Sequence, residues 1–333
     1  MSRKKAALFY DYPPGDGEVF GQGRRARIAG MTELYPEVVS AASFERHAPE
    51  LADLEVIFAT WGMPDLSDAQ LARLPKLQAV FYAAGNVKAF AQRLVDHDIV
   101  LVSAWAINAI PVAEMCLAQI LLSLRGYFRT VRAYRERRAQ DVKAFWRPGV
   151  NGETIGLIGM GKIGTRLRAL LADHPLRVIA HDPFLDAARA AELAVERVAL
   201  SELFARAYVV SNHIPDLPTT RGTLDGALFA RMRDGATFIN TGRGAQVVEA
   251  DLIAVLAARP DLTALLDVTW PEPPAPTSKL WSLPNVVISP HIGGTIGDEV
   301  TRLADCAIEE FERWQAGEPL RYQVTREVFA TMG

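Results

Sequence analysis

Three side chains in the second half of the sequence, those of Arg243, Glu272 and His291, are of types that together could support hydride transfer at a carbon bearing a hydroxyl group. Such a transfer needs a base for the hydroxyl proton, a cation for the charge that develops on the oxygen, and an anchor for the reacting molecule. A histidine, whose ordinary pKa is about 6.5, can take up and return a proton near neutral pH. A glutamate held against it would orient the ring, and an arginine can grip a carboxylate through two hydrogen bonds.

Each of these residues also has a structural explanation by itself. Arg243 could be a surface arginine at a strand end, Glu272 an acidic turn residue between two prolines, and His291 a capping or core histidine. All three, however, follow expected strands. Doubly wound sheets bind their ligands at the C-terminal ends of strands, so the positions favour a shared reaction centre.

A glycine-rich segment earlier in the chain is typical of a dinucleotide site. The expected strand 155–158 leads into Gly159, Gly161 and Gly164, and a helical stretch and a second strand, 177–181, follow. The first glycine permits a tight turn, the second lets the backbone approach a pyrophosphate, and the third lets the helix pack against the strand. The helix N-terminus supplies N–H groups and partial positive charge to phosphates. The alternative is a tight strand-to-helix turn that binds nothing.

Asp182 directly follows the second strand of this segment. A carboxylate at that place can accept hydrogen bonds from both ribose hydroxyls of NAD, and its charge would repel the 2′-phosphate of NADP. No basic residue follows before Arg189. The sequence therefore predicts NAD as the cofactor.

The elements that must position these residues alternate between apolar strands and helical patterns, as expected for parallel sheets with helices on both faces. Further strands are expected at residues 6–10, 55–59, 77–82, 99–103, 208–210, 237–240, 264–267 and 286–288. About 150 residues precede the glycine loop, which is enough for a separate domain. After Pro111, residues 112–122 are apolar nearly all round, which predicts a buried hinge helix joining two domains.

The composition of the chain limits which kinds of binding partner we expect. The chain has 333 residues, a formal net charge of −3 and 50% hydrophobic residues, so it can form sizeable cores and gives no electrostatic reason to expect nucleic acid or membrane as a partner. Cys116 and Cys306 lie in no CxxC or Cys/His spacing, so we expect a reduced, cytoplasmic chain without a metal site. The N-terminus predicts no targeting segment. The arginine-rich stretch 125–143 indicates a solvated helix or a subunit contact.

Together with their flanking residues, these segments resemble the D-isomer-specific 2-hydroxyacid dehydrogenase family, whose members interconvert 2-keto acids and D-2-hydroxy acids with NAD(H) or NADP(H). The resemblance covers essentially the whole chain and is strongest from about Pro111 to Gly294. The matching segments are Val112-Ala113-Glu114, the glycine loop, His213-Ile214-Pro215 with Thr220-Arg221-Gly222, Asn240 to Gly244, Leu266-Asp267-Val268 with Glu272-Pro273, and Pro284-Asn285-Val286 leading to Pro290-His291.

The resemblance implies an α/β fold of two Rossmann-like or flavodoxin-like doubly wound parallel-sheet domains with a cofactor cleft between them. Residues 1–103 plus 293–333 would form a discontinuous substrate domain, completed by a C-terminal helix at about 298–316, and residues 104–292 would form the NAD-binding Rossmann domain. A homodimer is also implied, with residues 127–146 as the candidate interface.

By the same resemblance, His291 would be the acid/base paired with Glu272, and Arg243 would bind the substrate carboxylate and carbonyl oxygen. Gly85 and Asn86 match a loop whose backbone N–H groups bind the substrate carboxylate. Asp267 would hold the nicotinamide carboxamide. The full set of implied cofactor-binding residues is Gly159, Gly161, Lys162, Ile163, Gly164, Asp182, His213, Ile214, Pro215, Thr220, Thr241, Gly242, Arg243, Asp267, His291 and Gly293.

The sequence also departs from the family pattern. Asn212, Asp216 and Leu217 stand beside Pro215 where we expect apolar, apolar and polar residues. Glu272 occupies the position where a formate dehydrogenase would carry glutamine, which disfavours that activity. Phosphite oxidation, which uses a similar triad, and an NAD(H)-sensing corepressor remain alternatives, and the sequence does not identify the 2-keto acid.

Overall fold

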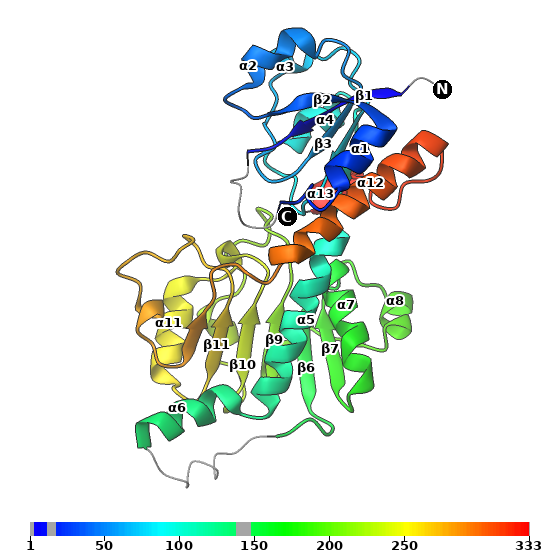
Figure 1. The fold of residues 1–333 in the computed structure, drawn as a ribbon. Helices are drawn as coiled ribbons and strands as arrows, with labels where there is room; N and C mark the ends of the chain where they lie inside the picture. Colours follow the sequence, from blue (N-terminus) through cyan, green and yellow to red (C-terminus); the bar gives the residue numbers. More distant parts are fainter. Residues whose placement is uncertain (1–2, 12–17, 138–147, 333) are drawn as a thin grey trace. The chain divides into compact units, whose positions relative to one another are not determined.

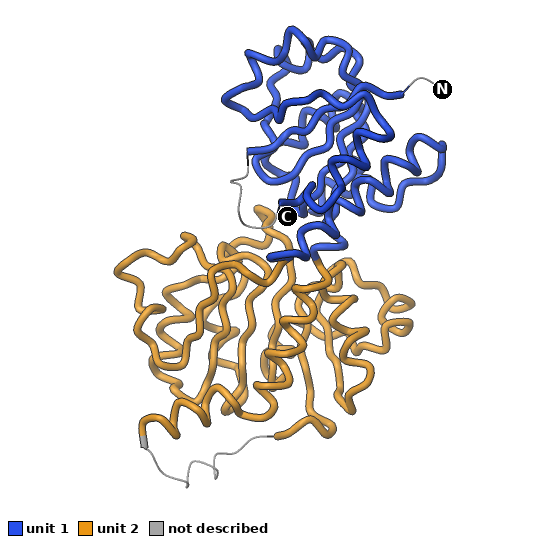
Figure 2. The backbone as a smooth tube through the Cα atoms, in the orientation of Figure 1, with its two compact units in different colours: residues 1–108, 295–333 blue, residues 109–294 orange. Residues whose placement is uncertain are grey.

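The computed structural model describes residues 3–11, 18–137 and 148–332. They form two compact units, one made of residues 1–108 and 295–333 and the other of residues 109–294 (Figure 2). The sequence placed these boundaries after residues 103 and 292. Each unit is described by itself below.

The first unit contains a five-stranded, all-parallel sheet in the order β2-β1-β3-β4-β5. Its strands are β1 (Lys4–Phe9), β2 (Thr32–Val39), β3 (Val56–Ala59), β4 (Ala79–Tyr82) and β5 (Val100–Ser103). Its helices are α1 (Arg24–Met31), α2 (Phe44–His47), α3 (Asp68–Leu71), α4 (Ala91–Asp96), α12 (Thr301–Ala316) and α13 (Arg326–Thr331). Every residue of β3 and β4 is buried, as expected for parallel strands covered on both faces. The late helix α12 belongs to this core, where Phe311 packs against Phe58 and Phe81.

The second unit contains a seven-stranded parallel sheet in the order β12-β11-β10-β9-β6-β7-β8 (Figure 1). Its strands are β6 (Thr154–Ile158), β7 (Arg177–His181), β8 (Glu196–Arg197), β9 (Val209–Asn212), β10 (Thr237–Asn240), β11 (Thr263–Leu266) and β12 (Val286–Ile288). The helices beside it are α6 (Tyr127–Arg137), α7 (Lys162–Leu170), α8 (Ala187–Glu192), α9 (Leu200–Arg206), α10 (Gly226–Phe229) and α11 (Glu249–Ala258). The chain order reverses at β6, which pairs with β7 on one side and β9 on the other, and such a reversal is where these sheets bind ligands.

Alternate strand residues of this sheet enter two separate cores. Ile239 packs with residues of α7 and of the long helix α5 (Trp105–Leu124), whereas the neighbouring Phe238 packs with residues of α9, α10 and α11. The predicted α/β class with two parallel sheets is therefore confirmed.

Helix α5 departs from the prediction in its length. The sequence placed its start after Pro111, but the helix begins at Trp105 and carries Pro111 in its interior. By length and composition it is also the one helix, among the described residues, that could cross a membrane. Core helices pass the same test, and Cys116, Ile120 and Leu124 of α5 are buried in the second unit.

Candidate active site

The candidate residues of the second unit all lie at the C-terminal edge of its sheet. Gly159 follows β6, His213 follows β9, Arg243 follows β10, Asp267 follows β11 and His291 follows β12. Because the strands are parallel, these residues, which are separated by up to 132 positions in the sequence (Gly159 to His291), lie at one edge of a single sheet.

The glycine turn has the geometry of a phosphate cradle. Gly159 has φ +88°, and a Cβ atom on Gly164 would lie 2.1 Å from the Gly159 carbonyl oxygen, so both positions require glycine. A Cβ on Gly161 would meet no atom within 4 Å, which leaves that side of the turn open. Among the described residues, no acceptor lies opposite the N–H groups of Lys162 and Ile163 in the first turn of α7.

Asp182 braces this turn. Its Oδ2 accepts a hydrogen bond from the Met160 N–H at 2.7 Å, and its Oδ1 accepts one from the Phe184 N–H at 2.8 Å. Each carboxylate oxygen can accept a further hydrogen bond. The side chain thus fixes the glycine turn and keeps acceptor capacity for ribose hydroxyls.

His291 and Glu272 are brought into direct contact, with 2.6 Å between Nδ1 and Oε1. Because the glutamate accepts this bond, Nδ1 carries a hydrogen and Nε2 is left as the reactive nitrogen. Nε2 makes no hydrogen bond to any described residue, and the side chain is 46% exposed. The other oxygen of Glu272 lies 3.4 Å from the Thr269 N–H.

Asp267 holds the loop that carries His291. Its buried carboxylate accepts hydrogen bonds from Ser289 Oγ (2.6 Å) and from the N–H groups of Ile292 (2.9 Å) and Gly293 (2.8 Å). Its backbone carbonyl accepts the His291 N–H at 3.0 Å, and His291 has φ +54°. Asp267 thus organises the histidine loop, and the carboxamide contact that the resemblance implies for it stays a prediction. Ser289 was not singled out from the sequence.

Arg243 joins the same cluster. Its half-buried guanidinium lies close enough to Glu272 and Asp216 for both carboxylates to raise its pKa, while burial, the larger effect, lowers it. An arginine stays charged despite such a shift. A Cβ on the next residue, Gly244, would lie 1.9 Å from the carbonyl carbon of Thr269, so the arginine turn and the segment leading to Glu272 are packed backbone to backbone.

His213 is a different kind of histidine. It is buried, its Nδ1 lies 3.1 Å from Thr241 Oγ1, and burial lowers its pKa to about 3. Burial also raises the pKa of the nearby Cys116 thiol to about 11. Both groups are neutral near pH 7, so neither is a candidate for proton exchange with a ligand.

The loop after His213 is closed by its own polar residues. Thr220 Oγ1 donates to the Pro215 carbonyl at 2.7 Å and accepts from the Leu217 N–H at 2.9 Å. Asp216 forms two hydrogen bonds with Arg221, at 2.8 and 3.1 Å. The departure at Asp216 is thus an ion pair that shapes the loop, and Thr220 supports the loop from within.

In the first unit, Gly85 and Asn86 follow β4. Ser103 Oγ donates to the carbonyls of Ala84 (2.9 Å) and Gly85 (2.6 Å), which turns these carbonyls toward the protein. The N–H groups of Gly85 and Asn86 donate to no acceptor in the described chain. Successive N–H groups of this kind form an anion-binding concavity. Ser103, which positions them, was not anticipated.

Comparison with known proteins places this site in a family. Residues 117–293 match the model described as "D-isomer specific 2-hydroxyacid dehydrogenase, NAD binding domain". The (S)-sulfolactate dehydrogenase of Chromohalobacter salexigens is 34% identical over 248 residues, which are 73% of this chain and 79% of that protein. The D-3-phosphoglycerate dehydrogenase of Archaeoglobus fulgidus is 30% identical over 77% of this chain. The chain spans about half the length of that relative and of the mycobacterial enzymes of the same name.

Two solved structures extend the likeness to the whole chain. The apo D-mandelate dehydrogenase of Rhodotorula graminis has a TM-score of 0.80 at 22% identity and covers 99% of this chain and 100% of that one. A D-isomer specific 2-hydroxyacid dehydrogenase from Xanthobacter autotrophicus Py2, in complex with NADPH and MES, has a TM-score of 0.75 at 26% identity and covers 97% and 98% of the two chains. The predicted resemblance and the predicted NAD cofactor are confirmed.

Proposed function

Because the chain belongs to the D-isomer specific 2-hydroxyacid dehydrogenase family, we propose that it transfers a hydride between NAD(H) and a 2-keto acid/D-2-hydroxy acid pair. The observation that carries the proposal is the 2.6 Å His291–Glu272 pair beside the Arg243 guanidinium. A base with one unpaired nitrogen, a carboxylate that stabilises its charged form and a cation near both supply what carbinol oxidation needs.

In the direction of reduction, His291 donates the Nε2 proton to the carbonyl oxygen of the keto acid, and Glu272 stabilises the imidazolium before that step. In the direction of oxidation, Nε2 takes the hydroxyl proton. Arg243 binds the carboxylate and the carbonyl oxygen, so that the developing negative charge meets a fixed positive one. NAD(H), when bound, accepts or supplies the hydride at the substrate carbon.

The glycine turn would hold the pyrophosphate, since Gly161 is open and the first N–H groups of α7 have no acceptor in the described structure. Asp182 would accept the ribose hydroxyls. The Gly85–Asn86 loop would add N–H groups for the substrate carboxylate.

We also propose a homodimer. Helix α6 exposes Tyr127, Val131 and Tyr134 at the spacing of one helical face, as an interface helix does. The remainder of the expected interface, residues 138–146, lies outside the described residues. Sedimentation at several concentrations tests this state.

The test of the activity is NADH consumption, followed by absorbance, with a panel of keto acids: pyruvate, glyoxylate, hydroxypyruvate, 3-phosphohydroxypyruvate and sulfopyruvate. We expect turnover of at least one of them, weaker turnover with NADPH because of Asp182, and loss of turnover in Arg243→Ala. NAD⁺ reduction with phosphite alone would support a phosphite dehydrogenase instead. Tight NADH binding without turnover of any compound would support the sensing protein.

A further inference from the structure

Three buried amide side chains lie together at the C-terminal edge of the second sheet. Asn212 ends β9, Asn240 ends β10, and Gln246 follows the Arg243 turn. Asn212 Nδ2 donates to Asn240 Oδ1 at 2.9 Å and to Gln246 Oε1 at 2.6 Å. The exposed fractions of the three residues are 0%, 1% and 0%, so this amide network has no access to water.

The amide network grips the backbone on both sides of the Arg243 Cα atom. Gln246 Oε1 accepts the Arg243 N–H at 3.1 Å, and Asn240 Nδ2 donates to the Arg243 carbonyl at 3.2 Å. Asn240 Oδ1 also accepts the Gly242 N–H at 3.1 Å. A Cβ on Gly242 would lie 2.8 Å from two of the amides, so the turn rests directly on the network.

The guanidinium itself is held much less firmly. Among the described residues its one hydrogen bond is from Nη1 to the Gly242 carbonyl, at 2.7 Å, although an arginine offers five N–H donors. The direction of the remaining donors is therefore set by the backbone from which the side chain starts, and the amide network fixes that backbone.

The network also reaches the neighbouring loop. Gln246 Nε2 donates to the Ile214 carbonyl at 2.6 Å, and the Ile214 N–H lies 3.4 Å from Asn212 Oδ1. It thus ties the turn of the proposed substrate-binding arginine to the loop 213–215 of the proposed cofactor site.

The bonds between the amides do not by themselves explain these side chains, because a buried pair of polar groups can be replaced by apolar groups of similar shape at little cost in stability. The amides also satisfy buried backbone groups, the Arg243 N–H and the Ile214 carbonyl. Asn212 stands where the sequence analysis expected an apolar residue. What the amides add, and leucines could not, is hydrogen bonds directed at the Arg243 backbone.

We propose that Asn212 and Gln246 are positioning residues which, with Asn240, aim Arg243 at the carboxylate of the substrate. This inference rests on the proposed function. It predicts that loosening the network weakens the use of the keto acid, and that this kinetic effect does not simply follow the loss of stability.

The test compares Gln246→Leu, Asn212→Leu and the double variant with the wild type, using the best keto acid of the panel. We expect Gln246→Leu to lower thermal stability and to raise the KM for the keto acid about tenfold to a hundredfold, with a smaller change in the KM for NADH. The double variant should lose less stability than the two single variants lose together, because the Asn212–Gln246 bond can be lost only once, and its keto-acid KM should stay high.

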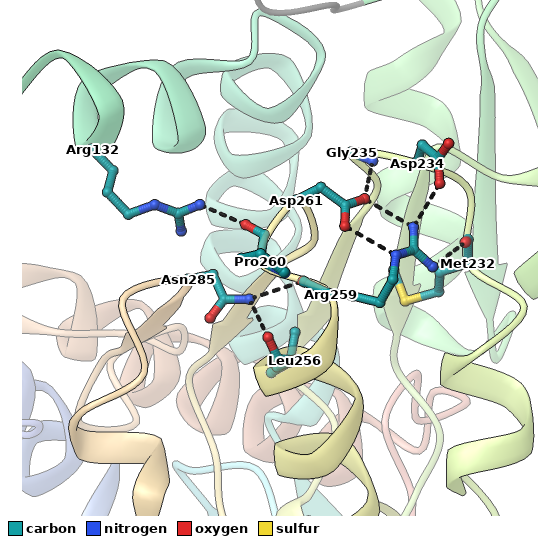
Figure 3. Close-up of polar contacts among 9 residues, drawn as sticks. All are labelled: Arg132, Met232, Asp234, Gly235, Leu256, Arg259, Pro260, Asp261 and Asn285. Atoms are coloured by element: carbon teal, nitrogen blue, oxygen red, sulfur yellow. Dashed lines mark hydrogen bonds and ion pairs between the residues drawn. The ribbon is translucent and has the colours of Figure 1, made fainter. Parts of the chain in front are cut away.

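Asn285→Leu is the matched control. Asn285 is a buried asparagine of the same sheet, but its Nδ2 donates to the carbonyls of Leu256 (3.0 Å) and Arg259 (3.3 Å) at the opposite edge (Figure 3). This variant should lose stability and keep the wild-type KM. An equal rise in KM in this control would show that the kinetic effect is general loosening and would overturn the proposal.

Action through Arg243 is tested in an Arg243→Lys background. If the network works by aiming the guanidinium, Gln246→Leu should change the keto-acid KM little once the guanidinium is absent. An undiminished rise would contradict the proposal, as would a wild-type keto-acid KM in the double variant. Should the wild type turn over no substrate, the proposed function fails on that result alone. Hydrogen exchange at the Gly242 and Arg243 amides would then still show whether the network fixes the turn: unchanged protection in Gln246→Leu would overturn it.

Discussion

The two edges of the seven-stranded sheet are rich in the same residue types and treat them differently. At the N-terminal edge, Arg259 forms hydrogen bonds with Asp261 at 3.0 and 2.8 Å and with Asp234 at 2.9 Å, and Arg132 donates to the Pro260 carbonyl at 2.7 Å (Figure 3). Arg132 also donates to the Pro284 carbonyl at 3.0 Å. At the C-terminal edge, Arg243 has one hydrogen bond, to its neighbour's carbonyl, in the described structure.

This difference in hydrogen bonding distinguishes Arg259, to which we assign a structural role, from Arg243, which we propose binds the substrate. Fixed partners saturate the guanidinium of Arg259, so it joins chain segments and offers little to a ligand. The guanidinium of Arg243 is half-buried and keeps most of its donors. Holding a charge out of water without saturating it costs stability, and such cost is typical of binding sites.

The largest expected effect is on catalytic activity, which should depend on a residue of the C-terminal edge of the sheet and not on one of the N-terminal edge. His291→Gln removes the proton donor and should lower kcat for keto-acid reduction about a hundredfold to ten-thousandfold, with NADH affinity nearly unchanged. NADH fluorescence titration and steady-state kinetics measure both. Arg259→Gln at the opposite edge should leave kcat/KM at the wild-type value; a comparable loss in that variant would erase the distinction.

The next effect contrasts two identical substitutions. Arg243→Lys should raise the keto-acid KM about tenfold or more, since an ammonium cannot form the planar two-point contact, and should change unfolding little. Arg259→Lys should instead lower the free energy of unfolding by about 1–3 kcal/mol, because its charged hydrogen bonds to Asp261 and Asp234 are lost. Urea unfolding and steady-state kinetics on both variants test these expectations. A higher KM in Arg259→Lys together with a lower stability in Arg243→Lys would refute the assignment of the two arginines.

A smaller effect concerns Glu272. Its carboxylate orients the His291 ring through the 2.6 Å contact with Nδ1, so Glu272→Gln should lower kcat for keto-acid reduction about tenfold. The measurement is kcat at saturating NADH, with NADH affinity as the control. An unchanged kcat would rule out the pairing role of Glu272.

The smallest effect sharpens the contrast between His213 and His291, which both lie at the C-terminal edge. The folded-state pKa of His213 is lowered to about 3, so between that value and about 6.5 the unfolded chain binds a proton that the folded chain does not. Stability should therefore fall as pH falls through this window, by about 2 kcal/mol between pH 7 and pH 5 from this residue. His213→Gln should flatten the profile, and the exposed His97→Gln should not.

Motifs whose geometry is local could be predicted from the sequence. The glycine turn at Gly159 and Gly164 and the strands at 56–59 and 79–82 are specified by neighbouring residues. Their predicted bounds therefore differ from the observed ones by at most two residues. Residue types and positions after expected strands singled out Arg243, Glu272 and His291, and the family resemblance assigned their roles. The structure joins the latter two in a hydrogen bond.

Elements that depend on distant contacts were missed or misplaced. Strand β2 contains Pro36 and several exposed residues, which hide its strand character, and it is held as an edge by pairing with β1. Helix α5 continues through Pro111 because its burial outweighs the local preference against an interior proline. Sequence spacing did not reveal that Gln246 would meet Asn212, since the contact exists only where β9 and β10 lie side by side.

The backbone contact at Gly244 limits how this enzyme could be redesigned. Since no side chain fits between that glycine and Thr269, the turn that carries the cation and the loop that carries the acid cannot be adjusted independently. A change in substrate selectivity would have to come from side chains outside this contact, such as the exposed indole of Trp270. The Arg243 turn and the Glu272 loop would have to be kept together.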